Sequence, residues 1–367
     1  MRNVTMAEWS VTKKQKKLVK EVLESGRLTY GDKTRELEER FAEIHGAKKA
    51  LFTSSGTSAL KIALHALKDK YGWKDGDEVL IPSVTFVATM NVVIMNNLTP
   101  VLVDVKRDTV NMDPELIEKA ITRKTVCILP VHLLGQPADM DSIMKIANKH
   151  NLRVVEDSCE TMFVNKIRGD IACFSTYLAH LLVTGIGGFI TTNDEKLATV
   201  MRSMMFHGRD ESYLNIDDKP ADISKRFWFP RFGYSDRMTE LEAALGLGEL
   251  DSWKDMIKQR QDNAEYLIWE LNDIVTFPIT YVRQHSFMFF PMFVEDRDGL
   301  MLYLEKNGIQ TRTMMPLTTQ PLVQKYLKKK YPNADYVNQH GLLIGCHQDL
   351  NRKDLKWIVE CIEEYYL

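Results

Sequence analysis

The stretch Lys49-Ala-Leu-Phe-Thr-Ser-Ser-Gly-Thr-Ser-Ala-Leu60 joins a short apolar run to a longer amphipathic segment. The run Lys49–Thr53 predicts a β-strand, and Ser58–Tyr71 predicts a helix because its apolar residues recur at helical spacing. The turn between them is rich in Gly, Ser and Thr, and the free amides of a helix N-terminus can bind a phosphate. A simple helix cap is the alternative, and this stretch alone leaves both interpretations open.

The same alternation of strand and helix continues through the first 250 residues. Five further runs predict strands: Glu78–Pro82, Pro100–Asp104, Thr125–Pro130, Arg153–Asp157 and Gly188–Thr192. Between them lie helix-like segments such as Asp113–Ala120 and Met140–His150, the second with Asp139 as its expected N-cap. This order predicts an α/β fold with a mostly parallel sheet that helices cover on both faces. Functional residues are then expected at the carboxyl ends of the strands.

The pattern changes from about residue 245 onward. The segments expected there are a helix at Gly248–Leu271, a strand at Ser286–Val294 and helices at Gly299–Asn307 and Arg352–Tyr366. A chain of 367 residues is also long for a single core. We therefore expect a large domain at 1–247 and a smaller C-terminal α+β domain at 248–367. The polar loop Arg209–Lys225 is the expected lid.

Composition limits the possible partners and the compartment. A formal net charge of −2 gives no reason to expect nucleic acid. No apolar stretch approaches the roughly 20 residues that span a membrane, and the N-terminus lacks the apolar core of a signal peptide. The five cysteines form no metal-binding cluster: Cys127, Cys159, Cys173, Cys346 and Cys361. Scattered thiols of this kind are typical of a cytoplasmic protein without a bound metal.

Several candidate site residues follow the expected strands. Val154-Val-Glu-Asp157 places a carboxylate at the end of an apolar strand, with Glu160 three residues later. In enzymes that use the vitamin B6 cofactor, such an aspartate pairs with the pyridine nitrogen, and Glu160 could reach the ring's phenolic oxygen. Phe86 could stack on the ring, and Ser175 could bind its phosphate. Taken singly, each has a structural alternative: a solvated strand-end acid, a core aromatic or an ordinary serine.

His180 is a further candidate, from a segment that contains no lysine. It lies in Cys173-Phe-Ser-Thr-Tyr-Leu-Ala-His180-Leu-Leu-Val-Thr-Gly-Ile-Gly-Gly188, and no lysine occurs from Phe174 to Thr192. A lysine would hold pyridoxal phosphate as a Schiff base and shuttle protons. A histidine can shuttle protons but cannot form that bond. An isolated histidine is more often structural, and the order of the motifs along the chain is what favours the catalytic interpretation.

From Gly26 to the C-terminus, the chain resembles the DegT/DnrJ/EryC1/StrS sugar aminotransferases, which belong to fold-type I of the pyridoxal phosphate enzymes. The matching stretches are Gly26-Arg-Leu-Thr-Tyr-Gly31, Ser55-Gly-Thr-Ser-Ala-Leu60, Ile81-Pro-Ser-Val-Thr-Phe-Val-Ala-Thr89, Pro130-Val-His-Leu-Leu-Gly-Gln-Pro-Ala-Asp-Met140, Glu156-Asp157, Gly185-Ile-Gly-Gly188, His207-Gly208 and Gly233-Tyr-Ser-Asp-Arg-Met-Thr-Glu240. The resemblance implies an aspartate aminotransferase-like α/β fold and a homodimer with shared active sites.

The resemblance also implies a role for each matching residue. Gly56, Thr57 and Ser175 would bind the cofactor phosphate. Phe86 would stack on the ring and Asp157 would pair with its nitrogen. The loop around Ser235 would reach the phosphate of the neighbouring subunit. The implied cofactor is pyridoxal 5'-phosphate or pyridoxamine 5'-phosphate.

Two departures from the family pattern occur together, because His180 replaces the lysine and Glu160 replaces the usual glutamine. The combination of Asp157, Glu160 and His180 resembles a 3-dehydratase branch of the family typified by GDP-4-keto-6-deoxymannose 3-dehydratase. A related CDP-sugar dehydratase holds an iron–sulfur cluster with clustered cysteines. This chain has no cysteine between Cys173 and Cys346, so the cluster-free branch fits it better.

The resemblance therefore implies a lyase of deoxysugar biosynthesis, as in lipopolysaccharide O-antigen formation, with His180 as its acid and base. The implied substrate is a nucleotide-linked 4-keto-6-deoxyhexose, with glutamate as the amine donor. Two alternatives remain, an aminotransferase that works without the lysine and a non-catalytic paralogue that binds cofactor or sugar nucleotide. Ile186 and Ser235 favour the second alternative, because the family usually has glutamate and asparagine there. No motif identifies the nucleotide.

Overall fold

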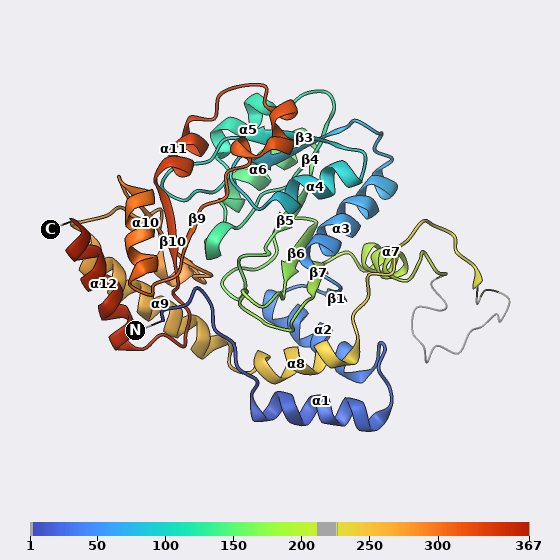
Figure 1. The fold of residues 1–367 in the computed structure, drawn as a ribbon. Coiled ribbons are helices and arrows are strands. Elements are labelled where there is room, and N and C mark those ends of the chain that lie inside the picture. The colour runs from blue at the N-terminus through green and yellow to red at the C-terminus, as the bar shows by residue number, and fades with distance from the viewer. Residues whose placement is uncertain (1–2, 211–224, 226, 367) are drawn as a thin grey trace.

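The computed structural model describes residues 3–210, 225 and 227–366. Its larger sheet has seven strands in the order β1-β7-β6-β5-β4-β2-β3 (Figure 1). In chain order these are β1 (Lys49–Thr53), β2 (Glu78–Pro82), β3 (Thr99–Val103), β4 (Thr125–Ile128), β5 (Arg153–Asp157), β6 (Ile171–Ser175) and β7 (Gly188–Thr192). Neighbouring strands are parallel except where β7 pairs with β1 and β6. The predicted mostly parallel sheet is confirmed.

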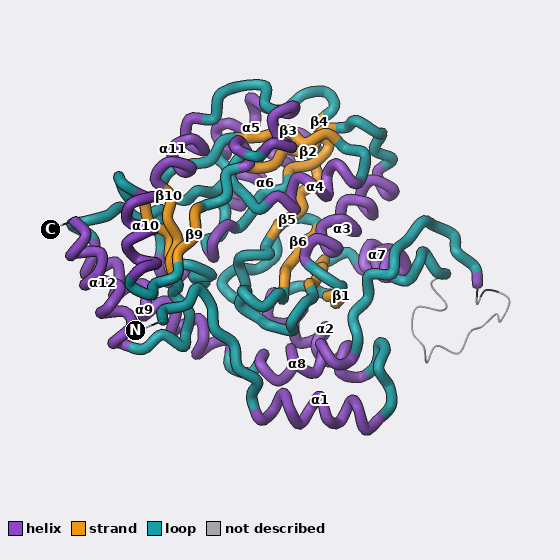
Figure 2. Tube along the Cα trace, viewed as in Figure 1, coloured by secondary structure: helices purple, strands orange, loops and turns teal. Residues whose placement is uncertain are grey.

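Helices cover both faces of this sheet, as buried parallel strands require (Figure 2). One face packs against α3 (Gly56–Tyr71), α4 (Val87–Met95) and α7 (Glu195–Met205). The other face packs against α2 (Asp32–His45) and α8 (Glu240–Leu250) near β1, and against α5 (Pro114–Ala120) and α6 (Met140–His150) near β3. Helix α1 (Lys13–Ser25) lies outside this layer, against α8.

A second, antiparallel sheet lies in the C-terminal part of the chain. Its strands β8 (Phe290–Phe293), β9 (Thr311–Thr313) and β10 (Gly341–Ile344) are arranged in the order β8-β10-β9. They share a separate core with α9 (Trp253–Leu271), α10 (Arg297–Lys306) and α12 (Arg352–Tyr366), while α11 (Pro332–His340) packs on the larger core. Val4 pairs with Ile309, so the N-terminal segment reaches this unit. The boundary between 247 and 248 stays a prediction.

Two predicted elements need correction, and one strand of the large sheet was missed. Strand β6, Ile171–Ser175, was not predicted, because it has one β-branched residue and no alternation. The expected strand Ser286–Val294 is shorter, because Phe287 has a positive φ of 46° and its neighbours bond to the loop at Gly135 instead. The expected helix Gly248–Leu271 is two helices, α8 and α9, with a break at Asp251 and Ser252. The other predicted elements agree with the structure to within two residues at each end.

Two further predictions concern the periphery of the molecule. Most of the expected lid, Arg209–Lys225, falls at residues 211–224, outside the described residues. Within the described part of the chain, no helix is long and apolar enough to cross a membrane.

Candidate active site

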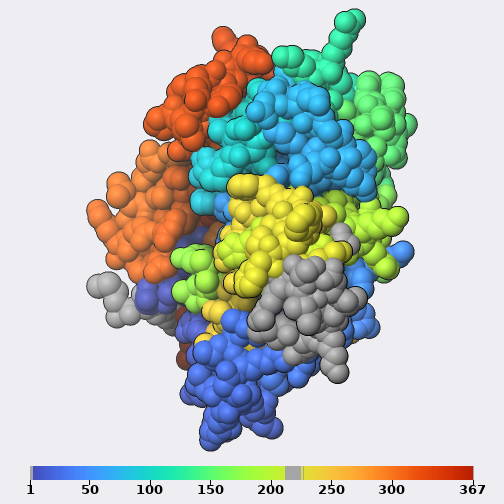
Figure 3. All heavy atoms as spheres, turned by 90° about the vertical axis from the view of Figure 1, so that its right-hand side faces the viewer, coloured from blue at the N-terminus to red at the C-terminus, as the bar shows by residue number. Residues whose placement is uncertain are grey.

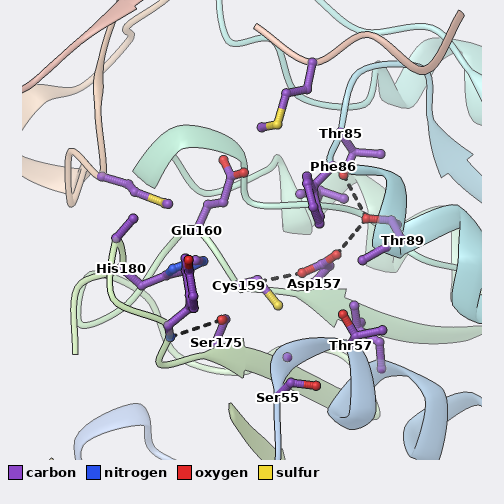
Figure 4. A pocket seen from close by; sticks show the side chains of 18 of the residues that line it. Ser55, Thr57, Thr85, Phe86, Thr89, Asp157, Cys159, Glu160, Ser175 and His180 are labelled. Carbon is purple, nitrogen blue, oxygen red and sulfur yellow. Dashed lines mark hydrogen bonds between the residues drawn. The ribbon is translucent and has the colours of Figure 1, made fainter. Parts of the chain in front are cut away.

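The carboxyl ends of the parallel strands meet at one edge of the large sheet, and the loops that follow them enclose a cavity of about 400 Å³ (Figure 4). Strand β7 begins at the same edge, because it runs antiparallel to its neighbours. Polar and aromatic lining residues include Ser55, Thr57, Thr85, Phe86, Thr89, Asp157, Cys159, Glu160, Ser175, Tyr177 and His180. The smaller unit closes one side with Met288, Phe289 and Met315.

Seven of the eight predicted site residues line this one cavity: Gly56, Thr57, Phe86, Asp157, Glu160, Ser175 and His180. They come from four segments that are far apart in the sequence, at or just beyond the ends of β1, β2, β5 and β6, and the sheet topology brings them together. Ser235 does not line it. It is exposed, and it pairs with Phe206 at the end of α7. Ser235 is predicted to contact the cofactor phosphate of a neighbouring subunit, and this role stays a prediction.

The N-terminus of α3 forms one wall of the cavity. Ser55 caps the helix, and its Oγ accepts a hydrogen bond from the Ser58 amide at 3.0 Å. A Cβ atom on Gly56 would lie 2.6 Å from Cys159 Sγ and 2.9 Å from Ser175 Cβ. Only glycine therefore lets the helix approach β6 so closely. This places the first amides of α3, the Thr57 side chain and Ser175 around one point, where they can bind a phosphate.

Asp157 lies buried at the end of β5, on the floor of the cavity (Figure 4). Its Oδ2 accepts a hydrogen bond from Thr89 Oγ1 at 2.9 Å, and its Oδ1 accepts one from the Cys159 amide at 3.1 Å. Burial raises the pKa of Asp157, and these hydrogen bonds oppose that shift. A cationic ring nitrogen in the cavity would favour the carboxylate form further.

Glu160 lies one turn beyond Asp157 and is also buried. Its Oε2 accepts a hydrogen bond from the Leu134 amide at 2.8 Å. Leu134 has a positive φ of 59°, a backbone conformation that few non-glycine residues adopt. Burial raises the pKa of Glu160 to about 7, and the nearby Asp157 charge adds to the shift. This carboxyl can therefore hold a proton near neutral pH and donate it to a ligand.

His180 projects into the cavity from the loop between β6 and β7 (Figure 4). Its Nδ1 atom is buried and has no hydrogen-bond partner among the described residues. Burial lowers the pKa of His180 to about 4, so the ring is neutral at pH 7. A buried polar atom without a partner is costly in a folded protein, and a polar ligand in the cavity would satisfy it.

Phe86 is an aromatic ring at the rim, 55% exposed, immediately before α4. An aromatic ring left this exposed beside a cavity is available to stack on a planar ligand.

The sequence analysis missed three features of the cavity: Thr89, Cys159 and the wall formed by Met288 and Phe289. The position of Thr89, one turn into the helix after Phe86, could have suggested contact with the strand ends.

No lysine lines the cavity among the described residues. The same part of the chain has no group of three or more His, Cys, Asp or Glu side chains placed to hold a metal ion. All five cysteines are free thiols, and Cys159 alone is not fully buried. The site thus combines a phosphate-binding helix end, a buried aspartate and an imidazole.

This fold and this set of residues define a pyridoxal phosphate enzyme of fold-type I. Residues 10–363 match the model of the DegT/DnrJ/EryC1/StrS aminotransferase family, and the chain belongs to that family. One curated relative is GDP-perosamine synthase of Caulobacter vibrioides, 32% identical over 90% of this chain and 89% of that protein.

Two similar solved structures are dehydratases. E. coli GDP-4-keto-6-deoxy-D-mannose-3-dehydratase with bound hydrated pyridoxal phosphate is 28% identical, with a TM-score of 0.90 over 99% of this chain and 100% of that chain. A histidine-to-asparagine variant of GDP-4-keto-6-deoxymannose-3-dehydratase with bound GDP-perosamine is 27% identical, with a TM-score of 0.91 over 98% and 100%. The cofactor of this family is pyridoxal or pyridoxamine 5'-phosphate.

The cavity of this chain fits that cofactor. Its volume lies within the range of small-molecule sites, roughly 300–1,000 Å³. The glycine at position 56 leaves room beside Ser175 that a Cβ atom would fill. Asp157 presents a carboxylate from the floor, and His180 presents a nitrogen without a partner.

Proposed function

We propose that this chain is a nucleotide-sugar 3-dehydratase that uses pyridoxamine 5'-phosphate without a covalent link to the protein. Its substrate is a nucleotide-linked 4-keto-6-deoxyhexose, from which it removes the C3 hydroxyl. One observation carries the proposal: seven of the eight expected site residues line one cavity, His180 is among them, and no lysine lines it among the described residues. The similarity to two dehydratase structures supports it.

The binding roles follow from the walls of the cavity. The α3 amides at Gly56 and Thr57, together with Ser175, hold the phosphate. Phe86 covers one ring face, and Asp157 pairs with the ring nitrogen. Glu160 donates a hydrogen bond to the phenolic oxygen, because burial keeps its proton in place near neutral pH.

When bound, the cofactor supplies an amine that condenses with the 4-keto group and a ring that accepts electrons. Asp157 keeps the ring nitrogen protonated. His180, neutral at pH 7, removes a proton from the C4' carbon of the cofactor. Because burial favours the neutral ring, the imidazolium ion would give the same proton to the C3 hydroxyl, which would leave as water. Hydrolysis would release a 4-keto-3,6-dideoxy sugar and ammonia and leave the cofactor oxidised to its aldehyde form, which glutamate would return to the amine form.

The active enzyme is a homodimer in this proposal, with Ser235 of each subunit near the phosphate of the other. The exposed position of Ser235 in the single chain supports this arrangement. A cytoplasmic location is consistent with five free thiols.

Borohydride treatment tests the proposal directly. The reagent reduces a covalent cofactor–lysine bond to a stable one. After reduction of the protein loaded with pyridoxal phosphate, we expect the intact mass of the chain to be unchanged, and His180→Lys should gain a cofactor adduct. A cofactor adduct on a lysine of the unaltered protein would contradict the proposal.

A second candidate is transamination, which the similarity to GDP-perosamine synthase favours. It predicts that nitrogen from glutamate enters the sugar instead of leaving as ammonia. A third candidate, a non-catalytic paralogue, rests on Ile186 at the cavity wall and on Ser235. It predicts that the cofactor binds but that neither product forms.

A further inference from the structure

The loop that carries His180 is closed at its base. The Thr176 amide donates to the Gly187 carbonyl at 2.9 Å, and the Thr184 amide donates to the Thr176 carbonyl at 3.0 Å. The two threonine hydroxyls also lie 2.6 Å apart. These bonds fix the neck of the loop, but His180 lies beyond them, so its position depends on what supports the rest of the loop.

Helix α8 supports that part of the loop at two points. Glu249 Oε2 accepts a hydrogen bond from the Val183 amide at 3.0 Å. One turn earlier, a Cβ atom on Gly246 would lie 3.1 Å from Thr184 Cγ2. Residues three apart lie on the same face of a helix. One face of α8 therefore both touches the loop and bonds to it.

The ring of His180 lies edge-on to the ring of Tyr177, in the same loop, with the ring centroids 6.0 Å apart. The amide of His180 donates to the Tyr177 carbonyl at 2.9 Å, within the loop. Its ring Nδ1 has no partner among the described residues, so no bond to that atom aims the imidazole. The backbone between Tyr177 and Val183 therefore sets where the ring points.

The geometry points to Glu249 as a positioning residue that holds His180 in the cavity through the Val183 amide. This inference rests on the proposed function, in which His180 transfers the proton. Leu181 and Leu182, between the two residues, are 2% and 1% exposed, so the segment is packed and transmits a shift at Val183. Burial raises the pKa of Glu249 to about 7, against the effects of the Val183 amide and Trp9. A hydrogen bond to a carboxylate that is partly shielded from water is stronger than one on the surface, and this applies to the bond between Glu249 and the Val183 amide.

The first test uses the chain without cofactor, so that it does not depend on the reaction. Isotope-labelled histidine gives one ring signal for each of the nine histidines. His180→Asn assigns the signal of His180 by removing it. We expect Glu249→Ala to shift that signal and Glu249→Gln, which keeps an acceptor oxygen, to leave it in place. Glu39→Ala, at an exposed glutamate of α2, is the control. An unmoved His180 signal in Glu249→Ala, or equal shifts in both Glu249 variants, would overturn the inference.

Gly246→Ala provides a second route that leaves the carboxylate in place and serves if Glu249→Ala does not fold. The added methyl group would lie between Leu37 Cδ2, at 3.0 Å, and Thr184 Cγ2, at 3.1 Å, and would crowd both. We expect it to move the His180 signal as well. If the signal stays where it is in a folded Gly246→Ala protein, α8 does not position the loop.

Kinetics with the loaded enzyme give the functional readout. We expect Glu249→Ala to lower kcat about 10- to 100-fold with KM for the nucleotide sugar unchanged, because a displaced base slows proton transfer without weakening binding. Glu249→Gln should restore most of kcat. An equal loss in both variants, or a change confined to KM, would contradict the inference. If the natural enzyme itself releases no ammonia, the proposed function fails, and the histidine signals still decide the role of Glu249.

Discussion

In the proposed function, His180 determines which reaction the cavity can perform. An imidazole accepts and returns a proton but cannot bind the cofactor covalently, whereas a lysine does both. The structure adds what the sequence lacked: the ring projects into the cavity, its Nδ1 has no partner among the described residues, and burial keeps it neutral. Seven of the cavity residues could be predicted from the sequence, because each lies in a motif that can be recognised without knowledge of the fold. Thr89 was missed, because its contact with Asp157 arises from packing between β5 and α4.

Replacing His180 with Asn removes the base but keeps a polar side chain of similar size. We expect ammonia release to fall by about 10²- to 10⁴-fold, the usual contribution of general acid–base catalysis. Cofactor affinity, measured by fluorescence quenching, should be nearly unchanged, because His180 is not among the proposed phosphate- or ring-binding groups. Retained activity would show that another base does the work.

Glu160 should make the stability of the chain depend on pH. Burial raises its pKa from 4.5 to about 7, so the folded chain holds a proton that the unfolded chain has lost. The stabilisation is fully present below pH 4.5 and disappears as pH rises through about 7. Relative to Glu160→Gln, the unaltered chain should lose on the order of 3 kcal/mol of unfolding free energy between about pH 5 and about pH 8. Urea unfolding without cofactor measures this difference. A constant difference across this range would show that Glu160 titrates normally.

At the scale of elements, the first turn of α3 is the most constrained part of the site. Gly56→Ala would place a Cβ atom against Cys159 Sγ and Ser175 Cβ. We expect a loss of about 1–3 kcal/mol in unfolding free energy, together with weaker cofactor binding. Cys159→Ala removes one of the two clashing atoms, so the cost of Gly56→Ala should be smaller in that background. Denaturant unfolding of the four proteins measures the coupling. If the losses of unfolding free energy in Gly56→Ala and Cys159→Ala simply add in the double variant, the expected clash between residues 56 and 159 does not occur.

The elements also show how far the sequence could predict the fold. Strands such as Glu78–Pro82 and Arg153–Asp157 were predicted with their exact bounds, because each has consecutive β-branched or aliphatic residues at its centre. Strand β6 could not be predicted, because Ala172 and Cys173 carry no strand signal and only the neighbouring strands place them. The shortened β8 depends on the backbone conformation at Phe287, which no local pattern indicates.

For the whole molecule, the proposed homodimer predicts that a second subunit completes the site. Trp228, Phe229 and Phe232 are 60%, 45% and 68% exposed. The part of the chain drawn in yellow, which begins after the grey residues, lies on the surface in Figure 3. Ser235 follows in the same segment. Several exposed aromatic rings close together mark an interaction surface. We expect a second subunit to cover these rings. Ser235 of one subunit would then lie near the cavity of the other subunit.

Trp228→Ser combined with Phe232→Ser should therefore weaken the dimer and lower cofactor affinity. Light scattering should report twice the chain mass of 42.3 kDa for the unaltered protein and a shift toward that single mass for the variant. Trp269→Ser is the matched control, because Trp269 is 79% exposed on α9, outside this segment. If the control dissociates as readily as the double variant, the aromatic segment is not the interface.

The most direct test of the central claim is the mass of the sugar product. The purified protein is supplied with pyridoxamine phosphate, isotope-labelled glutamate and nucleotide-linked 4-keto-6-deoxyhexoses, and each product is analysed by mass spectrometry. A 3-dehydratase in which His180 is the acid and base yields a sugar with one oxygen atom fewer, and it releases the labelled nitrogen as ammonia. A product in which the labelled nitrogen replaces the carbonyl oxygen would show that the chain is an aminotransferase and would contradict this account.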